Sequence, residues 1–307
     1  MKDSCILRKP LLNLCQKIYG PREISEKSID AGKNVNQLVE FARKNRLAHY
    51  LALEYSKSFA ENDIWKDISN KLICEYNDYE KNLRNALEAT KNILGEERFM
   101  IIKTFSSFPH LTNDLDVLVP DFKIAEESHK EVLDKKSSLP IDINTKVAWG
   151  KADAVSNDFV WNNTQEFNFE GIGFLIPSPA LDAIIRIAHI PFEVAHIRLG
   201  ELLHIYKQLS LSDWTILEDE AKLMGWPKTF GRMLSILELL HRKLFKTPFF
   251  QKGIMPASCT DNIGFPFRLP VSILAGGVIE KRAWRKLFGA RIIIKNRLSE
   301  WIDRKVS

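Results

Sequence analysis

The chain has 307 residues and a formal net charge of +5, with 45% hydrophobic and 27% charged residues. At roughly 150 residues per domain this length predicts about two domains, enough to bury a substantial core. With 14 Gly and 13 Pro, the composition excludes collagen-like, low-complexity and largely disordered chains. A net charge this small does not by itself indicate a nucleic-acid partner.

The cysteines and the hydropathy pattern bear on the cellular compartment. Cysteines at positions 5, 15, 74 and 259 form no Cys-x-x-Cys pair and lack the His spacing of a zinc site. This scatter predicts free thiols in a reducing cytoplasm. No apolar stretch approaches the roughly 18 residues of a membrane span, and charges interrupt residues 1–20 where a signal peptide would be apolar. We therefore expect a cytoplasmic protein with no transmembrane segment.

Two helical patterns come first along the chain. In residues 35–51, apolar residues recur three and four positions apart with polar residues between them. A second stripe of this kind runs from about Trp65 to Leu94, and Gly95 is a typical helix stop. Residues 1–95 are therefore predicted to form an N-terminal helical region.

Short apolar and β-branched runs follow. Residues 99–105 and 115–119 predict two strands joined by a loop that contains Pro109. Residues 140–147 alternate as a third strand, and residues 167–176 are a candidate fourth strand. Residues 96–178 are thus predicted to form an α/β core.

Helices are predicted to dominate the rest of the chain. Ser178 and Pro179 are typical of an N-cap and a first helical position. The Pro- and Gly-bearing stretch 248–277 is too long for an ordinary connection. The predicted fold class is α+β, with a small sheet flanked by the N-terminal helical region and a C-terminal helical region, residues 179–307, that ends in a basic tail.

Charge is distributed unevenly along the chain. Residues 222–305 contain seventeen Lys and Arg against five Asp and Glu, a net charge of +12. Because the whole chain carries +5, residues 1–221 carry −7. A basic C-terminal third is typical of proteins that bind a polyanion such as RNA, DNA or an anionic membrane. The alternative is a solvated helix face whose Lys and Arg stems cover apolar surface.

Two neighbouring carboxylates are the clearest chemical feature. Asp114 and Asp116 project from one face of the predicted second strand, because residues i and i+2 share a face. Asp142, on the third strand, is a third candidate ligand and could lower the proton affinity of an acceptor hydroxyl. Such oxygen ligands suit two Mg²⁺ ions about 3.5–4 Å apart, which activate a hydroxyl and neutralise a leaving pyrophosphate. The strand context carries this prediction, since a chain with 17 Asp is expected to contain about one Asp-x-Asp by chance.

Residues 103–119 read KTFSSFPHLTNDLDVLV and resemble the signature of the polymerase-beta-type nucleotidyltransferase superfamily. Within it the chain is most similar to the uncharacterised nucleotidyltransferase-like proteins of archaea and bacteria that carry helical flanks. The resemblance extends to residues 141–144 and 170–189. It implies a mixed sheet with helices on one face, Asp114 and Asp116 as Mg²⁺ ligands, and Asp142 as third ligand and base.

One position departs from the family pattern. Members place Gly, followed by Gly or Ser, after the first strand, where backbone N–H groups approach the triphosphate. No Gly stands between positions 95 and 150 of this chain. Three hydroxyl side chains and a lysine occupy the region instead, as candidate phosphate ligands or simply as a solvated loop. The candidate nucleotide-binding residues are Lys103, Thr104, Ser106 and Ser107.

A cluster of His and Glu follows the predicted sheet. His189, Glu193 and His196 would share one face of an unbroken helix, with Glu201 and His204 shortly beyond. Such a cluster could bind a transition metal in a hydrolase. Pro191 would disturb the helix, and the spacing is not that of a metalloprotease. The alternative is that these polar residues face the active edge of the sheet or pair internally.

The C-terminal segment mixes cations with aromatic residues between positions 278 and 288. Aromatic residues near Arg can stack on unpaired bases of a single-stranded RNA end, although such residues are also common in protein cores. The candidate acceptor-binding residues are Lys281, Arg282, Arg285 and Lys286.

These features lead to one main functional hypothesis and two alternatives. The first is a Mg²⁺-dependent nucleotidyltransferase that moves an NMP from an NTP, such as ATP, to an acceptor hydroxyl, with RNA or tRNA as the candidate acceptor. The second is a nucleotidyltransferase-like fold that has lost efficient chemistry and binds nucleic acid. The third is association with a membrane surface through the C-terminal segment.

Overall fold

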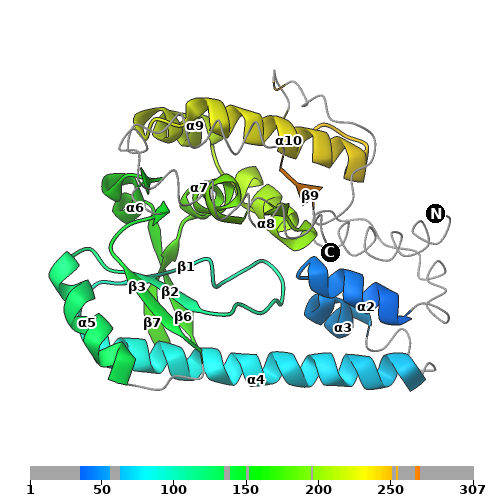
Figure 1. Cartoon of the computed structure of the whole chain (residues 1–307), viewed down its shortest axis with the longest axis horizontal. Helices are drawn as coiled ribbons and strands as arrows, with labels where there is room; N and C mark the ends of the chain where they lie inside the picture. The colour runs from blue at the N-terminus through cyan, green and yellow to red at the C-terminus, as the bar shows by residue number, and fades with distance from the viewer. Residues whose placement is uncertain are drawn as a thin grey trace, which may run out of the picture.

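The computed structural model describes residues 35–55, 63–134, 139–149, 152–194, 196–250, 254 and 267–269. The fold is α+β, as predicted: a mixed sheet lies above the long helix α4, and further helices lie above the sheet (Figure 1). The helices are α2 Val35–Lys44, α3 Ala48–Tyr55, α4 Asp63–Leu94, α5 Phe122–Asp134, α6 Asn157–Asn162, α7 Pro179–His189, α8 Leu199–Ser210, α9 Trp214–Leu223 and α10 Pro227–Phe245. The strands are β1 Met100–Ile102, β2 Leu115–Leu118, β3 Ile141–Asn144, β4 Ala148–Trp149, β5 Ala152–Asp153, β6 Thr164–Phe169, β7 Ile172–Pro177, β8 His196–Ile197 and β9 Phe267–Arg268.

The main sheet has five strands in the order β3-β2-β1-β7-β6. β1 runs antiparallel to β2 and parallel to β7, while β2 and β3 are parallel and β6 and β7 are antiparallel. The crossover helix α5 connects the parallel strands β2 and β3, as a parallel pair requires. The three strands predicted between residues 99 and 147 are therefore present, although each is shorter than its apolar run.

The candidate fourth strand is a hairpin of two strands, β6 and β7. Glu170 and Gly171 connect them with φ angles of 50° and 90°, and Asn168 Oδ1 accepts a 2.9 Å hydrogen bond from the Gly171 N–H. Two consecutive residues with positive φ make a hairpin turn that matches the twist of the strands. The prediction of a single strand over residues 167–176 was wrong. Glu is not a typical residue for the first turn position, so the sequence did not reveal the turn.

The two faces of the sheet pack against different layers. Ile101, Val117 and Ile143 belong to one buried cluster together with residues of α4 and α5. Met100 and Ile102 belong to a second cluster, which includes residues of α7 and α8. Helices thus lie against both faces, whereas the family resemblance implies helices on one face. The alternation of side chains along each strand separates the two clusters.

The structure confirms three predictions about where helices begin and end, and it divides one predicted helical pattern into two helices. Gly95 follows α4 with a φ of 60°, and its N–H donates to the Lys91 carbonyl. The Ser178 hydroxyl accepts from the Leu181 N–H at the start of α7, with Pro179 as the first helical residue. The helical pattern over residues 35–51 is divided into α2 and α3, because Arg46 adopts a left-handed conformation with a φ of 59°.

Asn45 connects the N-terminal helices to α8. It is fully buried; its side-chain oxygen accepts from the Leu199 N–H at 3.1 Å, and its carbonyl accepts from the Gly200 N–H at 3.0 Å. The first N–H groups of a helix have no partner within the helix, so Asn45 supplies the cap of α8. The cluster that contains α2 and α3 also contains α7 to α10.

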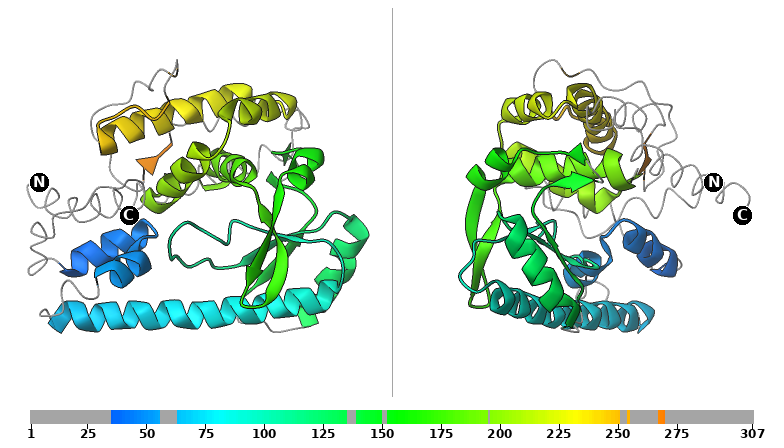
Figure 2. Two further views of the ribbon diagram at one scale, coloured as in Figure 1. Left: turned by 180° about the vertical axis from the view of Figure 1, so that it is seen from behind. Right: turned by 60° about the vertical axis from the view of Figure 1, so that its left-hand side comes forward.

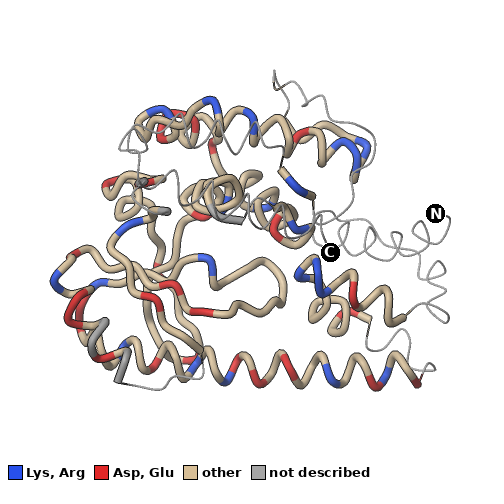
Figure 3. Tube along the Cα trace, in the orientation of Figure 1, with Lys and Arg blue, Asp and Glu red and all other residues tan. Residues whose placement is uncertain are grey.

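The C-terminal helices form two layers above the sheet. α7 and α8 lie next to the sheet, and α9 and α10 lie outside them (Figure 2). Lys and Arg recur along α10, whereas α9 carries Glu218, Asp219 and Glu220 beside a single Lys, and further acidic residues lie near the strands (Figure 3). Among the described residues, no helix is both long enough and apolar enough to cross a membrane.

Two helical glycines should respond in opposite directions to substitution by Ala. A Cβ at Gly200 would lie 2.9 Å from the Asn45 carbonyl oxygen, whereas a Cβ at Gly231 on α10 would meet nothing within 4 Å. We expect Gly200→Ala to lower the free energy of unfolding by about 1–3 kcal/mol through overpacking. Gly231→Ala should raise it by about 0.5–1 kcal/mol, because Ala loses less backbone entropy. Urea denaturation of both variants measures this, and equal shifts would contradict the Asn45–α8 contact.

Candidate functional site

Two of the predicted carboxylates lie side by side on the sheet. Asp116 and Asp142 are direct neighbours in the register of the parallel strands β2 and β3, so their side chains leave the sheet on the same face. Asp114 stands one residue before β2. Asp114 and Asp142 are exposed, while the Asp116 side chain is only 14% exposed. The structure therefore brings Asp116 and Asp142 together, while Asp114 precedes the strand that carries Asp116.

This arrangement concentrates negative charge around Asp116. Burial raises the pKa of Asp116, and the nearby carboxylates of Asp114 and Asp142 add to the increase. Lys103 opposes it, because its Nζ lies 2.9 Å from Asp116 Oδ2. A cation near the carboxylates would reduce the repulsion between them. In this structure the cation in contact with Asp116 is the ammonium group of Lys103.

The donor set suits Mg²⁺ in one particular mode. Within the described ranges, no group of three or more His, Cys, Asp or Glu side chains is arranged to hold a metal ion by itself. Mg²⁺ in phosphate-handling sites is usually bound by one or two carboxylates, with phosphate and water oxygens completing its octahedron. Asp116 and Asp142 fit that mode, in which the ligand brings part of the coordination shell.

Lys103 forms an unusual turn at the end of β1. It has a φ of 58°, and the Thr104 N–H donates a 2.7 Å hydrogen bond to the Ile102 carbonyl. The 4% exposed Thr104 also donates its hydroxyl to that carbonyl. L-residues rarely adopt this conformation, which glycine adopts freely. Lys103 therefore takes a glycine-like backbone conformation without being glycine, in the region where the superfamily that the sequence resembles has Gly.

A buried network holds the loop that follows Lys103. His204 on α8 is 2% exposed; its Nδ1 accepts from the Ser107 N–H at 3.1 Å, and its Nε2 bonds to Asp182 on α7. Because a backbone N–H can only donate, Nδ1 carries the lone pair and Nε2 carries the proton that Asp182 accepts. Burial and the charge of Arg186 lower the pKa of His204, which agrees with a neutral ring.

Arg186 completes this network. Its Nε donates to both oxygens of Asp182 at 3.0 Å, and its Nη2 donates to the carbonyls of Lys103 and Phe105 at 3.2 and 2.8 Å. Burial alone would raise the pKa of Asp182, but Arg186 and His204 outweigh burial and hold it at about 2. The backbone of residues 103–107 is therefore fixed to α7 and α8.

The network limits the roles open to the two serines. The hydroxyls of Ser107 and Ser106 lie 2.8 and 3.3 Å from His204 Nδ1, next to the Ser107 N–H. Nδ1 has a single lone pair for these three donors. A phosphate near this loop would compete with His204 for the hydroxyls. Sequence reasoning missed Asp182 and Arg186, although an acid and a base four residues apart inside an apolar helix were the available signal.

The predicted His and Glu cluster does not share a helix face. α7 ends at His189, a π-helical turn spans Ile190–Val194, and His196 lies in β8. Pro191 lies within that turn, where its missing N–H and its ring prevent an α-helix from continuing. The helix is interrupted, as the position of Pro191 predicted, and the side chain of Glu193 lies outside the described residues.

The two later members of that cluster pair internally, as the alternative predicted. Glu201 lies 3.6 Å from the guanidinium of Arg46, and His204 belongs to the network described above.

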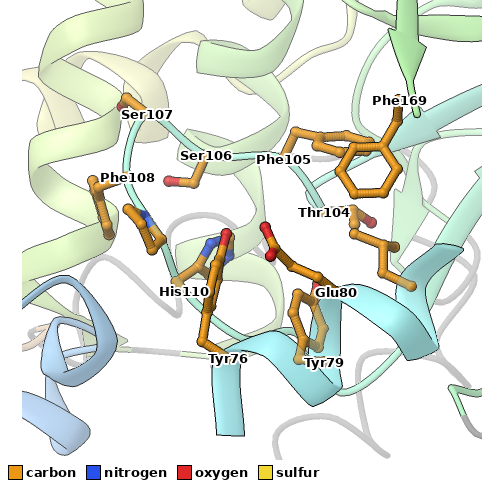
Figure 4. Close-up of a pocket in the computed structure, with 12 residues that line it drawn as sticks. Tyr76, Tyr79, Glu80, Thr104, Phe105, Ser106, Ser107, Phe108, His110 and Phe169 are labelled. Atoms are coloured by element: carbon orange, nitrogen blue, oxygen red, sulfur yellow. The ribbon is translucent and has the colours of Figure 1, made fainter. Parts of the chain in front are cut away.

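A cavity of about 280 Å³ lies on the other side of the same loop, against α4. Its polar and aromatic side chains face one another across the opening (Figure 4). The lining residues are Tyr76, Tyr79, Glu80 and Leu83 of α4, Thr104, Phe105, Ser106, Ser107, Phe108, Pro109 and His110 of the loop, and Phe169 of β6.

His110 stands out among these lining residues. It is 7% exposed, and its Nε2 is buried with no hydrogen-bond partner. Burial, together with the charges of Arg186 and Arg46, lowers its pKa to about 3. An unpaired buried polar group of this kind costs about 1–3 kcal/mol of stability.

The predicted acceptor-binding residues, at positions 281, 282, 285 and 286, lie outside the described residues. The cysteine at position 259 also lies outside them. Cys74 is an exposed free thiol on α4.

Comparisons of the chain with protein-family models, with curated proteins and with solved structures found no match.

The buried ion pair of α7 should be far more sensitive to substitution than an exposed pair of similar spacing. Asp182→Asn leaves the Arg186 guanidinium buried without its counter-charge, so we expect a loss of about 3–5 kcal/mol in the free energy of unfolding. The matched control is Asp219→Asn, whose carboxylate lies 3.0 Å from Lys222 Nζ on the exposed surface of α9. It should cause no measurable change. Comparable losses in the two variants, measured by urea denaturation, would refute a structural role for the network.

His110 should make the stability of the protein depend on pH. An unfolded histidine titrates near pH 6.5, so at lower pH the unfolded chain binds a proton that the folded chain excludes until about pH 3. The free energy of unfolding should therefore fall as the pH falls below 6.5, with His110 contributing about 1 kcal/mol per pH unit. His110→Phe should be less sensitive to pH when both proteins are unfolded in urea at about pH 7 and about pH 5. An unchanged slope would show that His110 is not buried as described.

Proposed function

We propose that the protein is a Mg²⁺-dependent nucleotidyltransferase that transfers an NMP from an NTP to an acceptor hydroxyl. The observation that supports this most is the register of β2 and β3, which sets Asp116 beside Asp142, with Lys103 paired to Asp116. Carboxylates on adjacent strands with a lysine at their edge suit a ligand that carries both phosphates and a divalent cation. When bound, Mg²⁺ would polarise the phosphates and offset the charge of the leaving pyrophosphate.

Each side chain has a distinct role in this proposal. Asp116 and Asp142 would hold the cation together with phosphate oxygens, and Asp114, exposed at the start of β2, would be a further ligand. Asp142, exposed on the edge strand β3, would also accept the proton of the acceptor hydroxyl. Lys103 would exchange Asp116 for a phosphate oxygen, because both are anionic partners within reach of one ammonium.

The distributions of charge and of cysteine support a proposal for the acceptor and for the compartment. The net charge of +12 over residues 222–305 suits a polyanionic acceptor, and we propose RNA, with tRNA as the specific candidate. The scattered cysteines, of which Cys74 is an exposed free thiol, suit the reducing cytoplasm.

Asp116→Asn tests this proposal. The amide keeps the size of the side chain but loses the charge that holds a cation, so transfer from labelled NTP to cellular RNA should fall by more than about 100-fold. The matched control, Asp67→Asn on the exposed surface of α4, should transfer as the unmodified protein does. Full activity of Asp116→Asn, or Mg²⁺-independent activity of the unmodified protein, would reject the assignment.

A catalytically degenerate module that binds nucleic acid is the second candidate. The specific observation in its favour is that Lys103 already neutralises Asp116, while both serine hydroxyls of the loop lie against His204. Such a module would bind RNA with a strong dependence on salt and would show no Mg²⁺-dependent affinity for NTP. Equilibrium binding of NTP without RNA, with and without Mg²⁺, separates the two candidates.

A further inference from the structure

The cavity between α4 and the loop has the features of a ligand site. Its walls carry the aromatic rings of Tyr76 and Tyr79 from α4 and of Phe105 and Phe169 from the loop and β6 (Figure 4). Small-molecule sites are typically concave and aromatic, with a few polar groups that fix orientation. The arrangement suits a flat ring, because aromatic side chains from different elements can contact both of its faces.

Two polar groups of the cavity retain hydrogen-bonding capacity. Tyr76 bonds to Glu80, and the Tyr79 hydroxyl lies 2.7 Å from Thr112 Oγ1, so both phenols already have partners. The Glu80 carboxylate has about four acceptor positions, of which Tyr76 takes one. His110 Nε2 has no partner. The cavity thus offers a strong acceptor from α4, and His110 in its lining has an unpaired ring nitrogen that is buried in the present orientation of the ring.

The electrostatic surroundings restrict the charge of the ligand. Arg186 and Arg46 act on His110 with positive charge, which disfavours a cationic ligand at that end of the cavity. Glu80, which lines the same cavity, disfavours an anion. The remaining class is an uncharged flat ring with an N–H donor for Glu80 and a polar ring edge for His110.

We propose that this cavity binds a nucleobase with an exocyclic amino group, which donates to Glu80 while the ring edge hydrogen-bonds to His110. A rotation of the His110 ring about its Cβ–Cγ bond presents its nitrogen to the ligand. The base lies between the aromatic side chains of α4 and those of the loop and β6. The inference goes beyond the proposed transfer and does not depend on it, because the β2 and β3 carboxylates do not line the cavity.

Adenosine and inosine test the proposal, since inosine has a carbonyl group in place of the amino group and an N–H in place of the ring acceptor N1. Titration calorimetry in EDTA removes any contribution from metal-dependent phosphate binding. Adenosine should bind saturably, and inosine about tenfold more weakly, because its carbonyl cannot donate to Glu80. In Glu80→Gln this difference should disappear, because an amide can turn to donate or to accept. Asp78→Asn, an exposed carboxylate of α4 that does not line the cavity, should keep the difference.

His110→Phe separates a binding role from a purely structural one. Phe fills the same space without an unpaired nitrogen, so the variant should be at least as stable in urea as the unmodified protein, yet bind adenosine about tenfold more weakly. If the variant is stable and adenosine affinity is unchanged, His110 does not contact the base and the proposal fails.

The base could come from a free nucleoside or from a single-stranded RNA, and the salt dependence tells these sources apart. Adenosine binding should be insensitive to salt, whereas an oligoadenylate that also uses basic residues should lose affinity as salt increases. Either source supports the cavity as a base site if Glu80→Gln removes the preference for a base with an amino group over one with a carbonyl group. The absence of saturable binding of both adenosine and oligoadenylate to the folded protein would overturn the inference, whether or not transferase activity is found.

Discussion

The position of the loop between β1 and β2 depends on one buried ion pair. Asp182 and Arg186 are 7% and 5% exposed, and the arginine reaches past its partner to two loop carbonyls. A buried guanidinium is costly unless its N–H donors have partners, so Arg186 depends on the loop carbonyls for hydrogen bonds. The loop in turn depends on Arg186 for its position. His204 extends the same constraint to Ser107. The loop therefore behaves as part of the α7–α8 framework.

This constraint connects the two candidate sites. Lys103, whose carbonyl Arg186 holds, carries the ammonium that contacts Asp116. A few residues later the same loop supplies Phe105 and His110 to the cavity against α4. The same loop therefore contributes to the surroundings of the carboxylates and to the aromatic cavity.

The sequence predicted local features better than contacts between distant residues. Helix periodicity, the Ser178 cap and the apolar runs located most helices and strands, because these depend on neighbouring residues. The register that sets Asp116 beside Asp142 follows from strand alternation and a parallel pairing, so the carboxylate site was within reach of sequence reasoning. The hairpin turn at Glu170 was missed because its residue type is atypical. The network of His204 and Asp182 joins residues 22 positions apart through tertiary packing, which no local pattern contains.

The cap that Asn45 provides for α8 has a consequence for how the chain folds. The residues that it joins, Asn45 and Leu199, are 154 positions apart. Contacts of such high sequence separation carry a large loop-closure entropy and slow the search for the native state. On the ribosome, α2 and α3 emerge long before the helix that they cap has been synthesised. Until then Asn45 lacks its native partner, so its two hydrogen bonds to α8 form only after the chain has been synthesised beyond residue 200.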